Sequence, residues 1–213
     1  MKKISRLLIK LLVLTMLLFT STISFGIKLD TIKGLSRLSN YKELKDIETI
    51  RISNFELRNR RPYMPIKNFT GVGVVYLQGK VIGLYTMKNG LSDGKNYIFY
   101  DNGQLRAQEN WKNGKREGEA IIYYENENVK QKSLFKNDKR EGDLFMYYPS
   151  GKLCQTEKFI NGKEDGEVIE YYESGVIKEK AYFINGKQEK EHFFYDEKGN
   201  LIKTDIYKNG VKQ

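Results

Sequence analysis

Histidine and cysteine, two side chains often used for nucleophilic chemistry or metal binding, each occur once in this chain of 213 residues, as His192 and Cys154. A Cys–His pair can activate a thiolate only where the fold brings both side chains within hydrogen-bond reach. These two residues fall in different copies of a repeated sequence, on runs that point differently. We therefore expect neither a Cys–His catalytic pair nor a cysteine-based metal site, and a single cysteine forms no internal disulfide bond.

Acidic side chains recur at a fixed spacing and are the second group that could do chemistry. Glu117, Glu141, Asp165 and Glu189 follow one another at intervals of 24 residues. Stacked hairpins would hold them about 10 Å apart, which suits neither carboxylate pair of a glycosidase especially well. Each acid lies beside a turn whose backbone N–H groups a carboxylate can bind. We predict a structural role for this column, and the chain also lacks a P-loop motif, so we expect no enzyme and no cofactor.

The interval of 24 residues runs through most of the chain and identifies an internal repeat. One copy reads "WKNGKREGEAIIYY", and related copies follow it. The turn asparagines that mark the period are Asn89, Asn113, Asn137, Asn161, Asn185 and Asn209. Two short runs rich in strand formers separate the two turn signals of each unit. Because Asn-Gly adopts the positive φ angles of a tight hairpin turn, each unit is predicted to be a β-hairpin, with Asp138 replacing the glycine in one copy.

The repeat predicts an all-β fold, an elongated single-layer antiparallel sheet of stacked hairpins. We divide the chain into residues 1–26, a signal peptide, residues 27–68, an N-terminal cap, and residues 69–213, an array of about six repeats. In the cap, "YKELKDIETI" predicts a short helix that leads into a strand through "RISNFEL". An uncovered edge strand could pair with other chains, so we expect the cap to cover the first edge of the sheet.

Alternation along the two runs predicts which side chains share a face. One face should carry two rows that begin with Tyr97 and Phe99 and continue with Ile121 and Tyr123, together with the rows of Leu105 and Trp111, as one apolar stripe. The opposite face should carry a row of tyrosines beside a row of mostly basic residues, and we predict these as a binding surface: Tyr100, Tyr124, Tyr148, Tyr172, Arg106, Lys130 and Lys178. The alternative is cross-strand aromatic packing that only stiffens the sheet.

Residues 1–26 have the layout of a secretory signal peptide, with basic "MKKISR", apolar "LLIKLLVLTMLLFT" and small polar "STISFG". The apolar run after Lys10 is short for a membrane span, which needs about 20 residues. A cleaved signal is the prediction, and a retained anchor is the alternative. Cleavage removes four basic residues and no acid, so the formal charge falls from +10 to +6. The protein is then exported, to the periplasm, the cell surface or the medium.

The repeated pattern "YxNGxL…WKNGKxEG…YY", entered through "FTGVGVVYLQGK", resembles bacterial MORN-variant repeats over residues 69–213. Exported proteins of this kind are commonly labelled YwqK family antitoxins of toxin–antitoxin systems. The resemblance implies hairpin repeats that serve as interaction or lipid-contact modules, and it supplies no catalytic residues.

Two functions from different classes follow from these patterns. The first is a non-catalytic protein-interaction module, antitoxin-like or immunity-like, that binds a protein partner. The second is an envelope-binding module for glycan or anionic lipid, which the tyrosine row and the positive charge favour. Nucleic acid is not an expected partner of an exported chain.

Overall fold

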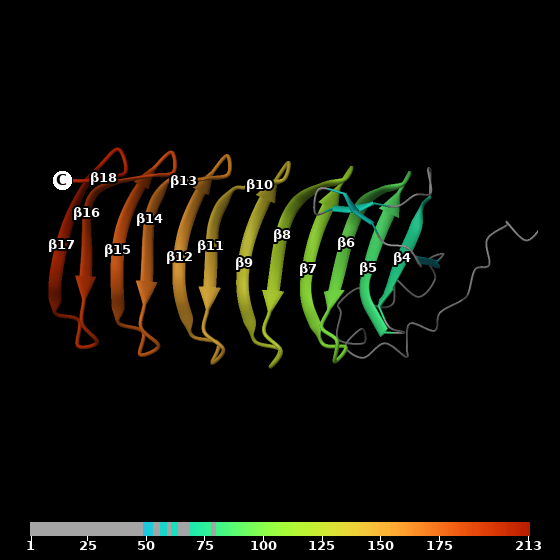
Figure 1. Ribbon diagram of the computed structural model, residues 1–213, viewed down its shortest axis with the longest axis horizontal. Coiled ribbons are helices and arrows are strands. Elements are labelled where there is room, and N and C mark those ends of the chain that lie inside the picture. The colour runs from blue at the N-terminus through green and yellow to red at the C-terminus, as the bar shows by residue number, and fades with distance from the viewer. Residues whose placement is uncertain (1–48, 53–55, 59–60, 64–68, 78–79) are drawn as a thin grey trace, which may run out of the picture.

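The computed structural model describes residues 49–52, 56–58, 61–63, 69–77 and 80–213, and this part of the chain consists of strands and turns (Figure 1). The described residues contain no helix that could cross a membrane. The strands are β1 (Thr49–Ile52), β2 (Glu56–Arg58), β3 (Arg61–Tyr63), β4 (Gly71–Leu77), β5 (Lys80–Lys88), β6 (Leu91–Phe99), β7 (Leu105–Lys112), β8 (Lys115–Tyr123), β9 (Val129–Lys136), β10 (Lys139–Arg140), β11 (Gly142–Tyr147), β12 (Leu153–Ile160), β13 (Lys163–Glu164), β14 (Gly166–Tyr171), β15 (Ile177–Ile184), β16 (Lys187–Tyr195), β17 (Leu201–Lys208) and β18 (Val211–Lys212).

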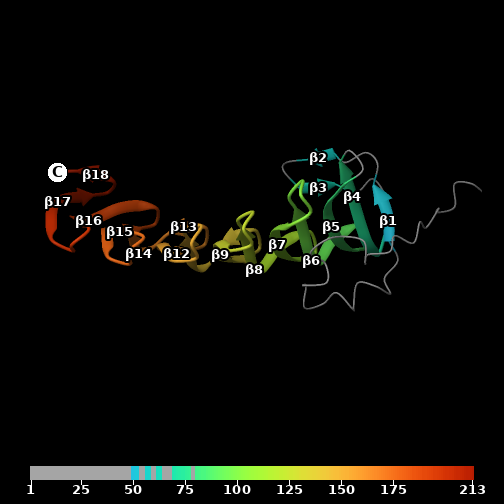
Figure 2. The same ribbon diagram turned by 90° about the horizontal axis from the view of Figure 1, so that it is seen from below.

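The strands form one open sheet of 16 strands in which chain neighbours pair side by side from β4 to β18. β10 and β13 pair only with β9 and β12, as the first segments of the strands that continue as β11 and β14. β2 and β3 form a separate two-stranded sheet. Figures 1 and 2 show the hairpins following one another along a single axis. The prediction of an elongated antiparallel sheet of stacked hairpins is confirmed.

The turns have the backbone geometry that the sequence predicted. In the first complete unit Asn113 has φ 48° and Gly114 has φ 76°, which is the pair of positive values that a two-residue type I′ turn requires. Asp138 replaces glycine and keeps φ at 69°. At the opposite end of the hairpins Glu127 has φ 70°, where the corresponding residue of other units is glycine. Local turn chemistry therefore fixes both ends of each unit.

The first edge of the repeat array is paired with a strand from the preceding segment. β1 runs parallel to β4, with Thr49 opposite Val72 and Ile52 opposite Val75. This pair departs from the antiparallel pattern of the other neighbours in the sheet. Of the helix expected over residues 41–50, only Thr49 and Ile50 are described, and both belong to β1. The signal peptide expected at residues 1–26 lies outside the described residues.

Burial is concentrated at the N-terminal end of the described sheet. Val74, Leu84 and Tyr97, on the neighbouring strands β4, β5 and β6, are between 0% and 1% exposed. In the last strands, by contrast, Leu201 is 54% exposed and Val211 is 64% exposed. The most deeply buried side chains therefore lie mainly at one end of the array, and fewer buried side chains, such as Leu144 and Phe159, continue along it.

Candidate binding surface

Each repeat contains a β-bulge that changes which face its side chains occupy. Ile122 pairs with Gln131 but the next residue, Tyr123, pairs with Val129, so Lys130 is an extra residue in β9. Directly opposite residues of an antiparallel pair point to the same face. Val129 and Gln131 therefore lie on opposite faces although they are two positions apart, because the bulge inserts one residue between them.

The bulges divide the large side chains between two faces, which we call the front face and the back face. The front face carries the column Trp111, Phe135, Phe159 and Phe183. The back face carries the columns Ile121, Phe145, Ile169, Phe193 and Tyr123, Tyr147, Tyr171, Tyr195, with Leu105, Val129, Leu153, Ile177 and Leu201 beside them. The prediction that the Trp111 and Phe135 column joins this apolar stripe is wrong. Alternation was counted across the bulge, where the phase of the strand shifts.

The predicted tyrosine and basic rows do come together, at one end of the hairpins. The Arg106 guanidinium carbon lies 5.9 Å from the centroid of the Tyr100 ring, and Lys130 Nζ lies 5.4 Å from that of Tyr124. Lys178 is part of the front face, because its Nζ lies 2.7 Å from the front-face carboxylate of Glu170. That hydrogen bond raises the pKa of Lys178.

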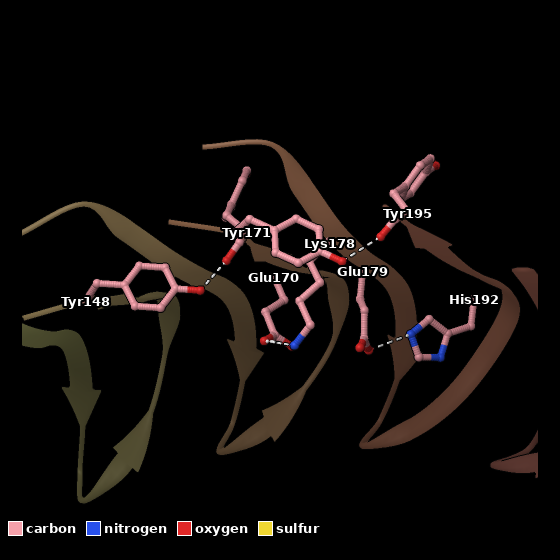
Figure 3. A network of polar contacts seen from close by, with 8 residues as sticks. Tyr148, Glu170, Tyr171, Lys178, Glu179, His192 and Tyr195 are labelled. Carbon is pink, nitrogen blue, oxygen red and sulfur yellow. Dashed lines mark hydrogen bonds and ion pairs between the residues drawn. The ribbon is translucent and has the colours of Figure 1, made fainter. Parts of the chain in front are cut away.

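The tyrosine hydroxyls are used to join one repeat to the next. Each donates a hydrogen bond to a backbone carbonyl oxygen of the following unit: Tyr100 to Tyr123 at 2.7 Å, Tyr124 to Tyr147 at 2.8 Å, Tyr148 to Tyr171 at 2.6 Å and Tyr172 to Tyr195 at 2.9 Å. Figure 3 shows the Tyr148 hydroxyl directed at the Tyr171 carbonyl. We call this series the tyrosine ladder. It gives the row a structural role and leaves the ring faces, rather than the hydroxyls, for any ligand.

The acidic column makes a second ladder at the other end of the hairpins. The backbone N–H of four turn asparagines donates to an acid of the preceding unit: Asn137 to Glu117 at 2.8 Å, Asn161 to Glu141 at 2.8 Å, Asn185 to Asp165 at 3.0 Å and Asn209 to Glu189 at 2.7 Å. The structural role predicted for these acids is confirmed. Hydrogen bonds from a backbone N–H to a carboxylate are charge-assisted, so each acid holds the next turn in place.

A polar network on the front face was not predicted from the sequence. His192 Nε2 lies 3.2 Å from a Glu179 carboxylate oxygen (Figure 3). His192 Nδ1 lies 2.9 Å from the Gln188 amide nitrogen. The imidazole stacks on Phe194 with ring centroids 4.0 Å apart. If Gln188 donates to Nδ1, then Nε2–H donates to Glu179, and both ring nitrogens are satisfied. The Glu179 contact joins β15 and β16, and only the strand register could have identified it, whereas Gln188 and His192 both lie on β16.

The other chemically distinctive residues are not gathered into a reactive site. Cys154 lies near Tyr148, and burial, followed by the interaction with Cys154, raises the pKa of Tyr148. His192 contacts Glu179 and Gln188, so the cysteine and the histidine have separate partners. No group of three or more His, Cys, Asp or Glu residues that could hold a metal ion occurs in the part of the chain that the structure describes.

One depression, of about 350 Å³, lies at the tyrosine end of the first complete unit. Arg106 and Tyr100 contribute to its lining, and both belong to the predicted binding surface. The remaining lining residues are Phe99, Asp101, Asn102 and Glu125. Its walls carry both signs of charge, which does not by itself select a ligand.

Comparison with known proteins identifies the repeat. Four segments match the MORN repeat variant family, at residues 92–113, 116–137, 140–161 and 164–185. No curated protein matches the chain. Twenty-one chains of solved structures match it. One of them is titled "Crystal structure of GtfA/B complex bound to UDP and GlcNAc", with 15% sequence identity and a TM-score of 0.25, and the match covers 60% of this chain and 26% of that chain. So low a TM-score supports no argument about function.

Proposed function

We propose that this MORN-variant repeat protein is a non-catalytic binding module that holds a partner protein against the back face of its sheet. The observation that supports the proposal is the band of apolar side chains on that face. Ile121, Phe145, Ile169 and Phe193 occupy equivalent positions in four units and are only half-buried. Leu134, on the same face, is 48% exposed. An apolar band of this kind, continued through several units, is typical of an interaction surface.

The dimensions of the band suit an extended protein contact. Each unit contributes two strands, so it advances the sheet by about 10 Å, and four units extend over about 40 Å. The tyrosine ladder and the acidic ladder join successive units at both ends of the hairpins, so the band is carried on a backbone held at regular spacing. Stable protein–protein contacts bury about 800 Å² on each partner, and a surface of this length can supply that area.

We extend this proposal to an exported, antitoxin-like or immunity-like role. The support for export is the signal-like layout of residues 1–26, and the support for the role is the resemblance of the repeat units to exported proteins that carry the antitoxin label. In this role the array would bind and neutralise one protein from the same cell or a neighbouring cell.

The test is affinity capture with the tagged full-length chain, compared with Phe145→Asp and with Lys130→Glu as a control on the front face. We expect one protein to be enriched by the unaltered chain and by the control, and to be lost from Phe145→Asp. Circular dichroism and Trp111 fluorescence establish that each variant is folded. Equal capture by Phe145→Asp, or no protein enriched over a tag-only control, would contradict the proposal.

A second candidate is binding of anionic lipid or glycan by the front face, in an envelope-associated role. The observation that favours it is that Arg106 and Lys130 are exposed beside tyrosine rings and neither forms an ion pair with a described residue. Cosedimentation with vesicles of anionic phospholipid, and with purified envelopes, tests it. The double variant Arg106→Ala, Lys130→Ala should lose sedimentation, whereas Phe145→Asp should keep it. The opposite pattern would reject this candidate.

A further inference from the structure

In two successive repeats the chain covers an aromatic ring of its front face with its own arginine. The guanidinium carbon of Arg116 lies 4.2 Å from the centroid of Phe135, and that of Arg140 lies 5.2 Å from the centroid of Phe159. These two arginines are 24 residues apart, as are the two rings. A guanidinium over a ring face is held by the negative potential of the π-system, so the position over the ring is a cation site.

The third repeat keeps the ring and the backbone but not the cation. Phe183 pairs with Gly166, as Phe159 pairs with Gly142 in the preceding unit. The residue that corresponds to Arg140, another 24 positions along the chain, is Glu164. Phe183 is half-buried, whereas Phe135 and Phe159 are 9% and 6% exposed. No cation of the described residues lies over the Phe183 ring, so the position that arginine fills in two units holds no cation in the third.

Carboxylates gather around this position and favour the binding of a cation. Glu164 is the cross-strand neighbour of Phe159, and Glu157 lies two residues before Phe159 on the same face. Neither carboxylate forms an ion pair with a described residue, and Glu157 accepts one hydrogen bond, from Gln155 at 2.7 Å. Burial and then the charge of Glu164 raise the pKa of Glu157, while Arg140 opposes the shift. The carboxylate of Glu157 therefore has one cation, Arg140, and one further acid, Glu164, in its electrostatic surroundings.

We propose that Phe183, Glu164 and Glu157 form a site for an external guanidinium group, carried by an arginine side chain of a peptide, in the position that Arg116 and Arg140 fill in the preceding units. The ring face supplies the π-system and the carboxylates supply the acceptors for the N–H groups. Arginine suits this combination better than lysine because its planar guanidinium both stacks on a ring and donates to carboxylates. The fourth unit lacks such a site, since its equivalent residue, Gln188, contacts His192.

The test is an NMR titration of the full-length chain with N-acetyl-arginine methylamide as the probe. N-acetyl-citrulline methylamide is the matched uncharged probe. The lysine analogue carries the same charge, so it measures how much the planar shape of the guanidinium contributes to affinity. We expect the arginine probe to bind about tenfold more tightly than the citrulline probe or better, with shifts confined to the region of Phe183. Equal affinity for the two probes, or shifts centred elsewhere, would overturn the assignment.

Two variants and a control complete the test. Glu164→Arg places in the third unit the residue that the chain already uses at the equivalent position of two others, so we expect it to fold and to abolish probe binding. Glu164→Gln keeps the shape and should weaken binding at least severalfold. Glu191 is an exposed acid of the back face, and Glu191→Gln should leave the affinity for the probe unchanged. Unchanged binding in Glu164→Gln would reject the site. Capture of a partner by the back face is measured separately, so failure of one proposal leaves the other standing.

Discussion

The two ends of the sheet use the same hairpin backbone but bury it to very different extents. Tyr97 of β6 is 1% exposed, whereas Phe193, at the equivalent position of β16, is half-buried. Phe99 is 3% exposed and its equivalent, Tyr195, is again half-buried. The difference shows that the 24-residue pattern determines the backbone. Which side chains become core depends on how far each face is shielded from solvent.

The front face differs between the two ends in chemistry as well as in burial. Ala120 and Leu144 are 7% and 2% exposed, and the equivalent residue in β16 is His192 with its polar partners. The column that begins with Glu109 and Ser133 is polar at both ends, because it ends at Asp205, which is held by two lysines. Because the ladders and turns hold the backbone, the position of Ala120 and Leu144 can change from apolar to polar without loss of the fold. The C-terminal units are therefore where recognition residues can accumulate.

The largest expected effect comes from removing matched rings at the two ends. Tyr97→Ala should lower the free energy of unfolding by about 3–5 kcal/mol, because it opens a cavity in a fully covered site. Phe193→Ala should cost only about 1 kcal/mol, because solvent already reaches the ring. Urea unfolding followed by circular dichroism measures both. Equal losses would show that the two ends are buried alike in solution, against the comparison.

The tyrosine ladder provides a way to separate the two ends. Tyr124→Phe removes the hydroxyl that binds the Tyr147 carbonyl, and we expect a loss of about 1 kcal/mol with faster amide exchange in the units that follow. Tyr182→Phe is the matched control, because the Tyr182 hydroxyl has no hydrogen-bond partner among the described residues. Denaturant midpoints and hydrogen exchange measure the two effects. If Tyr182→Phe lost as much stability as Tyr124→Phe, the tyrosine ladder could not explain how successive repeats are coupled.

The hairpins were predictable from sequence because turn chemistry is local. Asn113-Gly114 and its copies carry their own conformational preference, and the 24-residue period made every copy support the others. The face of the Trp111 column was not predictable, because the extra residue in each unit, such as Lys130, shifts the phase of alternation and only pairing with the neighbouring strand reveals it. The role of the acidic column was predictable from its position beside a turn. The contact of Glu179 with His192 was not, because it depends on the register between two strands.

A smaller effect is expected at the turn where glycine is missing. Glu127 has φ 70°, whereas Gly103 and Gly151 hold the equivalent position at φ 85° and 86°. Glu127→Gly should stabilise the protein by about 0.5 kcal/mol, because relief of the strain of about 1 kcal/mol exceeds the entropy cost of glycine. The melting temperature measures the change, with Glu125→Gly, which lacks a positive φ, as the control that should be neutral or destabilising. A lower melting temperature for Glu127→Gly would contradict the strain argument.

The smallest effect concerns the pH dependence of the C-terminal units. The folded protein raises the pKa of Glu157, so its ionised form disfavours the fold, and this penalty appears as the pH rises through the raised pKa. Glu157→Gln should therefore have a slightly higher melting temperature than the unaltered chain at pH 7. The advantage should disappear below about pH 3, where the carboxyl is protonated in both the folded and the unfolded state. A variant that is less stable at pH 7 would show that Arg140 outweighs Glu164 at this position.

Native-state hydrogen exchange, resolved by strand, tests the central claim most directly. The claim is that the hairpin backbone is uniform along the array, whereas the burial of its side chains decreases from the N-terminal to the C-terminal end. It predicts the strongest amide protection in β4 to β7, intermediate protection through β12, and the weakest in β16 to β18. Uniform protection along the array, or the strongest protection at the C-terminal end, would contradict it.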